Sequence, residues 1–260
     1  MPGVRLEVLG FWGGYPGPEG ASAGYLLHGE QGGELLLDCG SGVLSRLLES
    51  AGLEGLRRLE AVLLTHLHHD HAADLGVLSQ ALVVESYHGF ERAPLPVYVP
   101  EGALERARFY LAGDPWSRLR PLRPGEVVTV GAFRVEAAPA RHPVPALALR
   151  VEEGGRRLVY TGDTAASAEV EALAAGADLL LAEASHYEGE DGSRAGHLTA
   201  PEAGAMARRA GVARLVLTHL PHYGDLEELE EQARRAFGGP TGRAHSGLVV
   251  EVGAGGGRAS

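Results

Sequence analysis

Metal-binding side chains crowd the segment from His66 to His71, which reads H-x-H-x-D-H. Alternate side chains of an extended chain point the same way, so His66 and His68 can bind one ion together. Asp70 and His71 follow where the chain is expected to turn into a helix, and they suit a second ion. A polar loop with accidental histidines is the alternative, and the density of the string argues against it.

Further ligands must come from elsewhere, because four side chains cannot complete two coordination shells. Candidates follow apolar strands: His142 after residues 133–137, Asp163 in Thr-Gly-Asp and His219 in Leu-Thr-His. A shared carboxylate can hold two ions about 3.5–4 Å apart, and such a pair makes hydroxide available near neutral pH. We therefore predict a hydrolase with two Zn²⁺ ions bridged by Asp163, with Mn²⁺ or Fe²⁺ as alternatives.

Short apolar runs separated by turn residues and helical patterns must position these ligands. Strands are predicted at residues 4–9, 25–28, 34–39, 61–65, 97–99, 127–130, 133–137, 146–152, 157–161, 178–183, 214–218 and 248–252. Helices are predicted at residues 43–51, 72–82, 103–111, 168–175, 200–210 and 226–237. In the fifth helix, Thr199 can cap and Glu202 can reach back to the cap. The pattern favours two sheets packed face to face with helices outside.

One internal similarity bears on this architecture. Residues 62–69 and 215–222 are each an apolar strand that ends in Thr-His, at His66 and at His219. Chance similarity between two core strands explains this, and so do two structural halves that each direct a strand end into one cleft. The sequence leaves both explanations open.

Composition limits the class of protein. The 260 residues are 45% hydrophobic, which predicts one α/β domain over residues 1–260. The absence of a long apolar run predicts a cytoplasmic protein with no membrane partner. Cys39 is the only cysteine, so the chain can form neither an internal disulfide nor a cysteine-based zinc site.

Charge argues against general nucleic-acid binding, because 34 acidic residues outnumber 23 basic ones and the net charge is −11. Every basic residue is arginine. The arginine-rich stretch 106–123 either contacts a polyanion or forms a solvated face.

The chain resembles the metallo-β-lactamase superfamily, and within it the short form of ribonuclease Z. The resemblance rests on the H-x-H-x-D-H string and on Gly10-Phe-Trp-Gly-Gly, Leu37-Asp-Cys-Gly, His142-Pro-Val-Pro, Tyr160-Thr-Gly-Asp, Glu183-Ala-Ser, His197-Leu-Thr and Leu217-Thr-His. It implies a four-layer αβ/βα sandwich. It also implies His66, His68 and His142 on one ion, Asp70, His71 and His219 on the other, and Asp163 on both.

Two branches of the superfamily are disfavoured. Zinc β-lactamases that use a cysteine ligand would need Cys at Asp163, and the flavodiiron branch normally has Glu at His68. By resemblance, His197 matches the histidine beside the scissile phosphate. We expect it to stabilise the phosphoryl oxygens or protonate the leaving oxygen, while Asp70 and Asp163 position the attacking water.

Ribonuclease Z normally inserts a long RNA-binding arm between the counterparts of His142 and Asp163, and here 21 positions separate them (163 − 142 = 21). We therefore expect a small phosphodiester, such as a cyclic nucleotide or a short oligonucleotide, rather than structured tRNA. A thioester or lactone hydrolase with the same ligands is the alternative. A non-catalytic binding module would show a missing ligand, and none is missing. A homodimer is left open.

Other residues have two interpretations. Asp38 and Glu183 either orient ligating imidazoles or cap turns. His69, His186, His222 and His245 either line the cleft or are ordinary exposed or hydrogen-bonded histidines.

Overall fold

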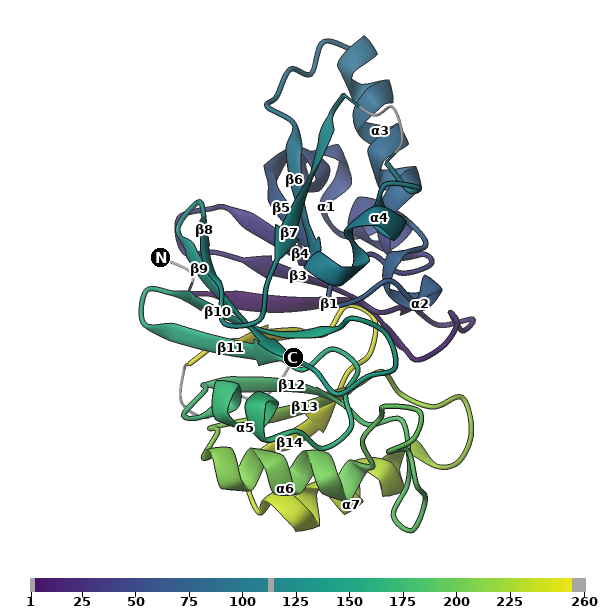
Figure 1. The fold of residues 1–260 in the computed structure, drawn as a ribbon, viewed down its shortest axis with the longest axis vertical. Coiled ribbons are helices and arrows are strands. Elements are labelled where there is room, and N and C mark those ends of the chain that lie inside the picture. The colour runs from purple at the N-terminus through teal and green to yellow at the C-terminus, as the bar shows by residue number, and fades with distance from the viewer. Residues whose placement is uncertain (1–2, 112–114, 254–260) are drawn as a thin grey trace.

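The computed structural model describes residues 3–111 and 115–253. Two sheets lie face to face in it, and helices cover the outer face of each, as Figure 1 shows. The predicted four-layer αβ/βα sandwich is therefore confirmed. Within the described ranges, no helix is both long enough and apolar enough to cross a membrane.

The first sheet has the strand order β15-β1-β3-β4-β5-β6-β7, with β2 paired to β1. Helices α1 and α3 pack on its outer face (Figure 1), and the short helix α2 leads into the site. The strands are β1 (Arg5–Trp12), β2 (Ala21–Ser22), β3 (Gly24–His28), β4 (Glu34–Leu37), β5 (Leu59–Leu63), β6 (Leu95–Pro100), β7 (Ser117–Leu122) and β15 (Val249–Glu251). The helices are α1 (Val43–Arg58), α2 (His69–Ala72), α3 (Leu75–Tyr87), the 3₁₀ turn η1 (Glu101–Ala103) and α4 (Leu104–Ala107).

The second sheet has the order β14-β13-β12-β11-β10-β9-β8. Strands β11 to β14 run parallel, so the chain leaves β11, β12 and β13 at the same edge. The strands are β8 (Val127–Val130), β9 (Phe133–Pro139), β10 (Leu147–Glu153), β11 (Arg156–Tyr160), β12 (Leu179–Glu183), β13 (Leu215–Thr218) and β14 (Thr241–Arg243). Its covering helices are α5 (Ala168–Ala174), α6 (Ala200–Ala210) and α7 (Leu226–Phe237).

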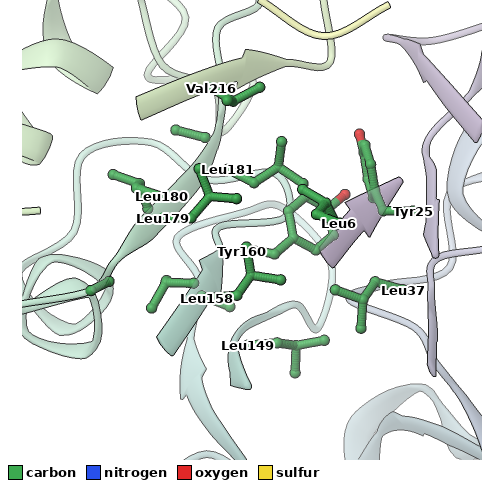
Figure 2. Packing of buried hydrophobic residues seen from close by; sticks show 14 of the residues in the cluster. Leu6, Tyr25, Leu37, Leu149, Leu158, Tyr160, Leu179, Leu180, Leu181 and Val216 are labelled. Atoms are coloured by element: carbon green, nitrogen blue, oxygen red, sulfur yellow. The ribbon is translucent and has the colours of Figure 1, made fainter. Parts of the chain in front are cut away.

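The main core fills the space between the sheets, because alternate residues of each strand point inward. In β4, Leu35 and Leu37 belong to this inner core, whereas Leu36 packs toward the helices. Figure 2 shows Tyr25 of the first sheet near Tyr160 of the second, with ring centroids 4.9 Å apart. Both phenols are buried, and each finds a polar partner next to the site.

The helix predicted at residues 72–82 is wrong in its bounds, since the chain forms α2 and α3 with a break between them. The Asp74 amide donates to the Cys39 carbonyl at 3.0 Å rather than to Asp70 four residues earlier. This contact between distant segments ends α2 after one turn. The predicted end of α1 at residue 51 coincides with a kink, where Gly52 has φ 58° before the helix resumes.

Two further predictions need correction. The helix predicted at residues 103–111 is helical only over Leu104–Ala107, and it tightens afterwards, with Tyr110 bonded three residues back to Ala107. The arginine-rich stretch contains an unpredicted edge strand, β7, in which Arg118 and Arg120 point to solvent. Gly154 and Gly155, both with positive φ, form the turn that joins the antiparallel strands β10 and β11.

Candidate metal centre

The predicted metal-binding residues meet where strands of both sheets end. The segment after β5 supplies His66 and His68, and α2 supplies Asp70 and His71. From the second sheet come His142 after β9, Asp163 after β11 and His219 after β13. The two Thr-His strand ends therefore lie in different sheets and converge on one cluster, as the interpretation with two structural halves requires.

One group of donors comprises His66, His68, His142 and Asp163, with one ligand atom from each within 4.8 Å of the others. His68 Nδ1 lies 3.0 Å from His66 Nε2 and 3.1 Å from His142 Nε2. His66 Nε2 also lies 3.6 Å from Asp163 Oδ2. Three imidazole nitrogens and a carboxylate oxygen thus surround one point.

A second group comprises Asp70, His71, Asp163 and His219. His219 Nε2 lies 3.1 Å from Asp70 Oδ2 and 3.3 Å from Asp163 Oδ2. His71 Nε2 lies 3.2 Å from Asp163 Oδ1. Asp163 is the one residue common to both groups, and it occupies the position that a bridging carboxylate needs.

The cluster leaves buried polar atoms that a cation would satisfy. His71 Nε2 and Asp163 Oδ1 are buried and lie 3.2 Å apart, but the geometry gives neither atom a hydrogen bond. An unpartnered buried polar group is costly, and a buried carboxylate more so, unless opposite charge or a metal compensates. Imidazole and carboxylate donors with no sulfur also fit zinc and related divalent ions. The residues present therefore fit divalent metal ions.

Asp38 holds the first-sheet residues of the cluster in position through hydrogen bonds to Thr65 and His71. It is fully buried with φ 57°, and its carboxylate accepts hydrogen bonds from the Thr65 amide and hydroxyl at 2.7 and 2.8 Å. It also pairs with His71 Nδ1 and accepts from the Tyr160 hydroxyl, both at 2.7 Å. Holding Nδ1 of His71 directs Nε2 into the cluster, so of the two interpretations of Asp38 the structure favours orientation of an imidazole.

The imidazoles of His142 and His219 are oriented by groups for which no role was predicted. His142 Nδ1 donates to the Gly196 carbonyl at 3.0 Å. Ser185 Oγ lies 2.8 Å from His219 Nδ1 and donates to Glu183 Oε2 at 2.6 Å. These partners are local in space and distant in sequence, so no spacing pattern identified them.

The glycine-rich end of β1 also belongs to the site. The Gly14 amide donates to Asp70 Oδ2 at 2.7 Å. A Cβ at Gly13 would lie 2.7 Å from the His219 ring, so a side chain there would collide with that ring. Glycine lets this backbone approach the cluster closely.

Burial and neighbouring charge set the protonation of the first donor group, which comprises His66, His68, His142 and Asp163. Burial lowers the pKa of His66, His68 and His142, and nearby imidazoles lower it further. These three rings are therefore neutral, which is the form that binds metals. Burial alone would raise the pKa of Asp163, but the fields of His219, His71 and His66 outweigh it and keep the carboxylate ionised.

His197 stands at the rim of the cluster. Its Nδ1 lies 3.0 Å from Glu183 Oε1 and 4.0 Å from Asp163 Oδ2. Burial would lower its pKa, but the hydrogen bond and charge of Glu183 raise the pKa of His197 to about 9. Glu183 is fully buried, and its carboxylate contacts His197 directly and His219 through the Ser185 hydroxyl.

Just after His197, the capping box of α6 forms as predicted, with Thr199 accepting from the Glu202 amide. The remaining histidines lie farther from the cluster. His186 sits at the rim with its ring 6.1 Å from His197, and His222 stacks on aromatic residues. His69 and His245 are exposed and have hydrogen-bond partners.

Comparisons with known proteins agree with this geometry. The family model for the beta-lactamase superfamily domain matches residues 34–220. The probable metallo-hydrolase YhfI of Bacillus subtilis (strain 168) is 37% identical over 250 residues, which cover 95% of this chain and 100% of the relative. A ribonuclease Z of Methanopyrus kandleri is 30% identical over 282 residues, which cover 95% of this chain and 97% of the relative.

Solved structures show the same fold. The crystal structure of the metallo-beta-lactamase fold protein YhfI matches with a TM-score of 0.87 and 36% identity, covering 95% of this chain and 98% of the other. The short form of human tRNase Z matches in fold with a TM-score of 0.76 and 23% identity, covering 96% and 100%. The chain therefore belongs to the beta-lactamase superfamily and is a metal-dependent hydrolase related to ribonuclease Z.

Proposed function

We propose that this chain is a dinuclear zinc phosphodiesterase that acts on small phosphodiesters. Two ions are proposed because the donors form two groups that share Asp163. Each group offers three side chains of its own and the shared Asp163, and a catalytic zinc site commonly uses three protein ligands besides water. Bound divalent ions would polarise a phosphoryl oxygen and make hydroxide available near neutral pH.

The observation that carries the phosphodiester assignment is the pair formed by His197 and Glu183. Nδ1 of His197 is held by Glu183 at 3.0 Å, so Nε2 is the nitrogen that can face a substrate. The raised pKa of His197 keeps the ring protonated at neutral pH. A protonated imidazole beside the metal-binding groups can stabilise a phosphoryl oxygen or protonate a leaving alkoxide.

Asp70 is proposed as the second catalytic residue. The Gly14 amide donates to its Oδ2 at 2.7 Å and so holds that atom. With that atom fixed, the carboxylate can accept a hydrogen bond from the attacking water and orient it toward phosphorus. Asp163, in the same donor group, is proposed to help position this water.

Elemental analysis tests the number of ions. After mild dialysis, we expect about two zinc ions per chain, because the donors exceed what one tetrahedral zinc requires. A stable content near one ion, unchanged by added zinc, would refute the bridged pair.

Turnover tests the substrate class. The zinc-loaded enzyme is compared on bis-p-nitrophenyl phosphate, cyclic nucleotides and short oligonucleotides, and on a thioester and a lactone. We expect the phosphodiesters to be cleaved with the higher kcat/KM. Faster cleavage of the thioester or the lactone would favour the alternative function and overturn the assignment.

A further inference from the structure

Three aromatic rings form a stack next to the metal centre. The His222 imidazole is 4.5 Å from the Trp12 ring at an interplanar angle of 17°, and 3.8 Å from the Tyr15 ring at 7°. Two parallel rings this close to one imidazole would overlap if both lay on the same face. Trp12 and Tyr15 therefore lie on opposite faces of His222, and Tyr15 forms one end of the stack.

The stack is tied to the cluster through the backbone. Gly13 packs against the His219 ring and Gly14 donates to Asp70, and Tyr15 is the next residue. A tight turn places Tyr15 there, since its amide bonds to the Gly13 carbonyl at 2.9 Å and Gly14 has φ 77°. Tyr15, the outer ring of the stack, thus directly follows Gly14, whose amide contacts the cluster at Asp70.

The stack is also fixed in position. His222 Nε2 donates to the Tyr15 carbonyl at 2.8 Å, which joins the loop after β13 to the loop after β1. The two loops are joined again where Gly13 and Leu220 bond through their backbones at 3.1 Å. A ring held in this way loses little conformational freedom when a ligand stacks on it.

Tyr15 leaves one face open to solvent. Its side chain is 60% exposed although His222 covers one side of the ring. If the neighbouring metal centre cleaves phosphodiesters, a substrate that also reaches the open face of Tyr15 must carry a phosphate group. A nucleotide combines a phosphate with a planar ring, and aromatic side chains stack on any of the four bases.

We propose that the open face of Tyr15 stacks on the nucleobase of a nucleotide substrate whose phosphate lies at the metal centre. This inference rests on the proposed phosphodiesterase function and names the substrate class as nucleotidyl. Stacking uses the π-face and not the base edges, so Tyr15 favours nucleotides over other phosphodiesters while discriminating weakly among bases.

Calorimetric titration of the zinc-loaded, full-length protein provides the test, with AMP and ribose 5-phosphate as ligands. The two ligands share the ribose and its 5′-phosphate and differ at C1′, where AMP carries adenine and ribose 5-phosphate a hydroxyl, so the ratio of their Kd values separates stacking from phosphate binding. The variants are Tyr15→Leu, which removes the ring, and Tyr15→Phe, which keeps it. Tyr87→Leu is the matched control, because Tyr87 is 82% exposed at the end of α3.

In the wild type we expect AMP to bind about 5- to 150-fold more tightly than ribose 5-phosphate, the range for one stacked base. In Tyr15→Leu the two Kd values should become about equal, with the Kd of ribose 5-phosphate unchanged. Tyr15→Phe and Tyr87→Leu should keep the wild-type ratio. Equal Kd values for the two ligands in the wild type, or a ratio that survives Tyr15→Leu, would overturn the proposal. Equal weakening of both ligands by Tyr15→Leu would do the same, since it would assign Tyr15 to the phosphate site.

The titration and the turnover assay together separate the stacking site at Tyr15 from the proposed phosphodiesterase function. A base-dependent Kd ratio without turnover of any phosphodiester would support the stacking site and reject the proposed function. Turnover of phosphodiesters without a base-dependent ratio would support the function and reject the stacking site.

Discussion

His197 is held at Nδ1 by the buried carboxylate of Glu183, and its Nε2 is proposed to act on the substrate. Replacing His197 should therefore affect catalysis more than metal binding. His197→Ala should keep both metals and lower turnover of diesters with poor leaving groups by about 100- to 10,000-fold, the usual contribution of a general acid. The effect should be smaller for p-nitrophenolate, which leaves without protonation. Steady-state rates are measured with metal content on the same samples. Full activity on every diester would reduce His197 to a structural role, and loss of a metal would make it a ligand.

The pKa of His197 also predicts a pH dependence. Because Glu183 raises this pKa to about 9, turnover of a poor-leaving-group diester should fall as pH rises through about 9. Glu183→Gln removes the charge that raises the pKa, so the alkaline fall should move to lower pH. Rates of both proteins are followed across the range, with metal content measured at each pH. An unmoved alkaline limb would contradict this assignment.

Asp38 orients the imidazole of His71, so its replacement should weaken metal binding although Asp38 is not itself a metal-binding candidate. Asp38→Asn keeps the size of the side chain but removes the carboxylate that pairs with His71 Nδ1. Changes of this kind typically weaken metal binding by about 10- to 100-fold. Competition with a chromophoric chelator measures the zinc Kd. Asp178→Asn is the control, because Asp178 also accepts a backbone amide, from Arg157, and an equal loss in both variants would refute a specific role.

At the scale of elements, a polar network joins the far ends of β1, β3, β4 and α1. His28 pairs with Glu7 at 2.9 Å and with Glu34 at 3.1 Å, and Arg58 pairs with Glu34. Burial would lower the pKa of His28, but its bonds to Glu34 and Glu7 raise it overall. The protonated ring therefore stabilises this end of the sheet.

The resulting stability depends on pH in a defined direction. A raised folded-state pKa means that the stabilisation is fully present below about pH 6.5 and is lost as pH rises through the raised value. His28→Ala should thus lower the free energy of unfolding by about 1.5–3 kcal/mol at pH 6 and by less at pH 9. Urea unfolding at both pH values measures this, with exposed His245→Ala as the control. A difference that does not change with pH would contradict it.

Strands with clear alternation or apolar runs were predictable, because both faces of β4, β5 and β13 are buried and read as continuous apolar segments. Strand β7 was not, since Arg118 and Arg120 on its exposed face indicated only a solvated face, and Pro121 lacks the amide that a central strand needs. Proline is tolerated there because β7 lies at the sheet edge. The break between α2 and α3 depends on a contact from Cys39, which no local pattern contains.

Residues of the metal centre also differ in whether the sequence could predict them. The seven metal-binding candidates could be predicted because imidazole and carboxylate groups at strand ends have a recognisable pattern. The Gly14 amide, Ser185 and the stack of Tyr15 on His222 could not, because each depends on the relative placement of segments distant in sequence.

At the scale of the whole molecule, charge and topology together predict discrimination against large RNA. Only the β10–β11 hairpin stands between His142 and Asp163, and the net charge of −11 repels polyanions. Two arginines of stretch 106–123 are also paired, Arg108 with Glu105 and Arg123 with Glu101. We expect precursor tRNA to be cleaved with a much lower kcat/KM than a small cyclic nucleotide at physiological salt. Comparable values for the two substrates would refute this expectation.

Metal removal should destabilise the whole fold, because each donor group takes side chains from both sheets. An ion that binds only the folded state adds about 4 kcal/mol when its free concentration is a thousand times its Kd. Chelation should therefore lower Tm, and added zinc should restore it. The alanine variant of exposed His245 should show the same shift as the wild type. A Tm that is insensitive to chelation would show that the ions do not join the sheets.

The division of each donor group between two sheets has a consequence for the order of events during biosynthesis. His66, His68, Asp70 and His71 leave the ribosome well before Asp163 and His219 are made, so a growing chain holds only half of either donor set. Neither set is complete until the second sheet has formed and docked on the first. Metal acquisition is therefore expected to be a late step that follows assembly of the sandwich, and partly synthesised chains should compete poorly for the metal ions of the cell.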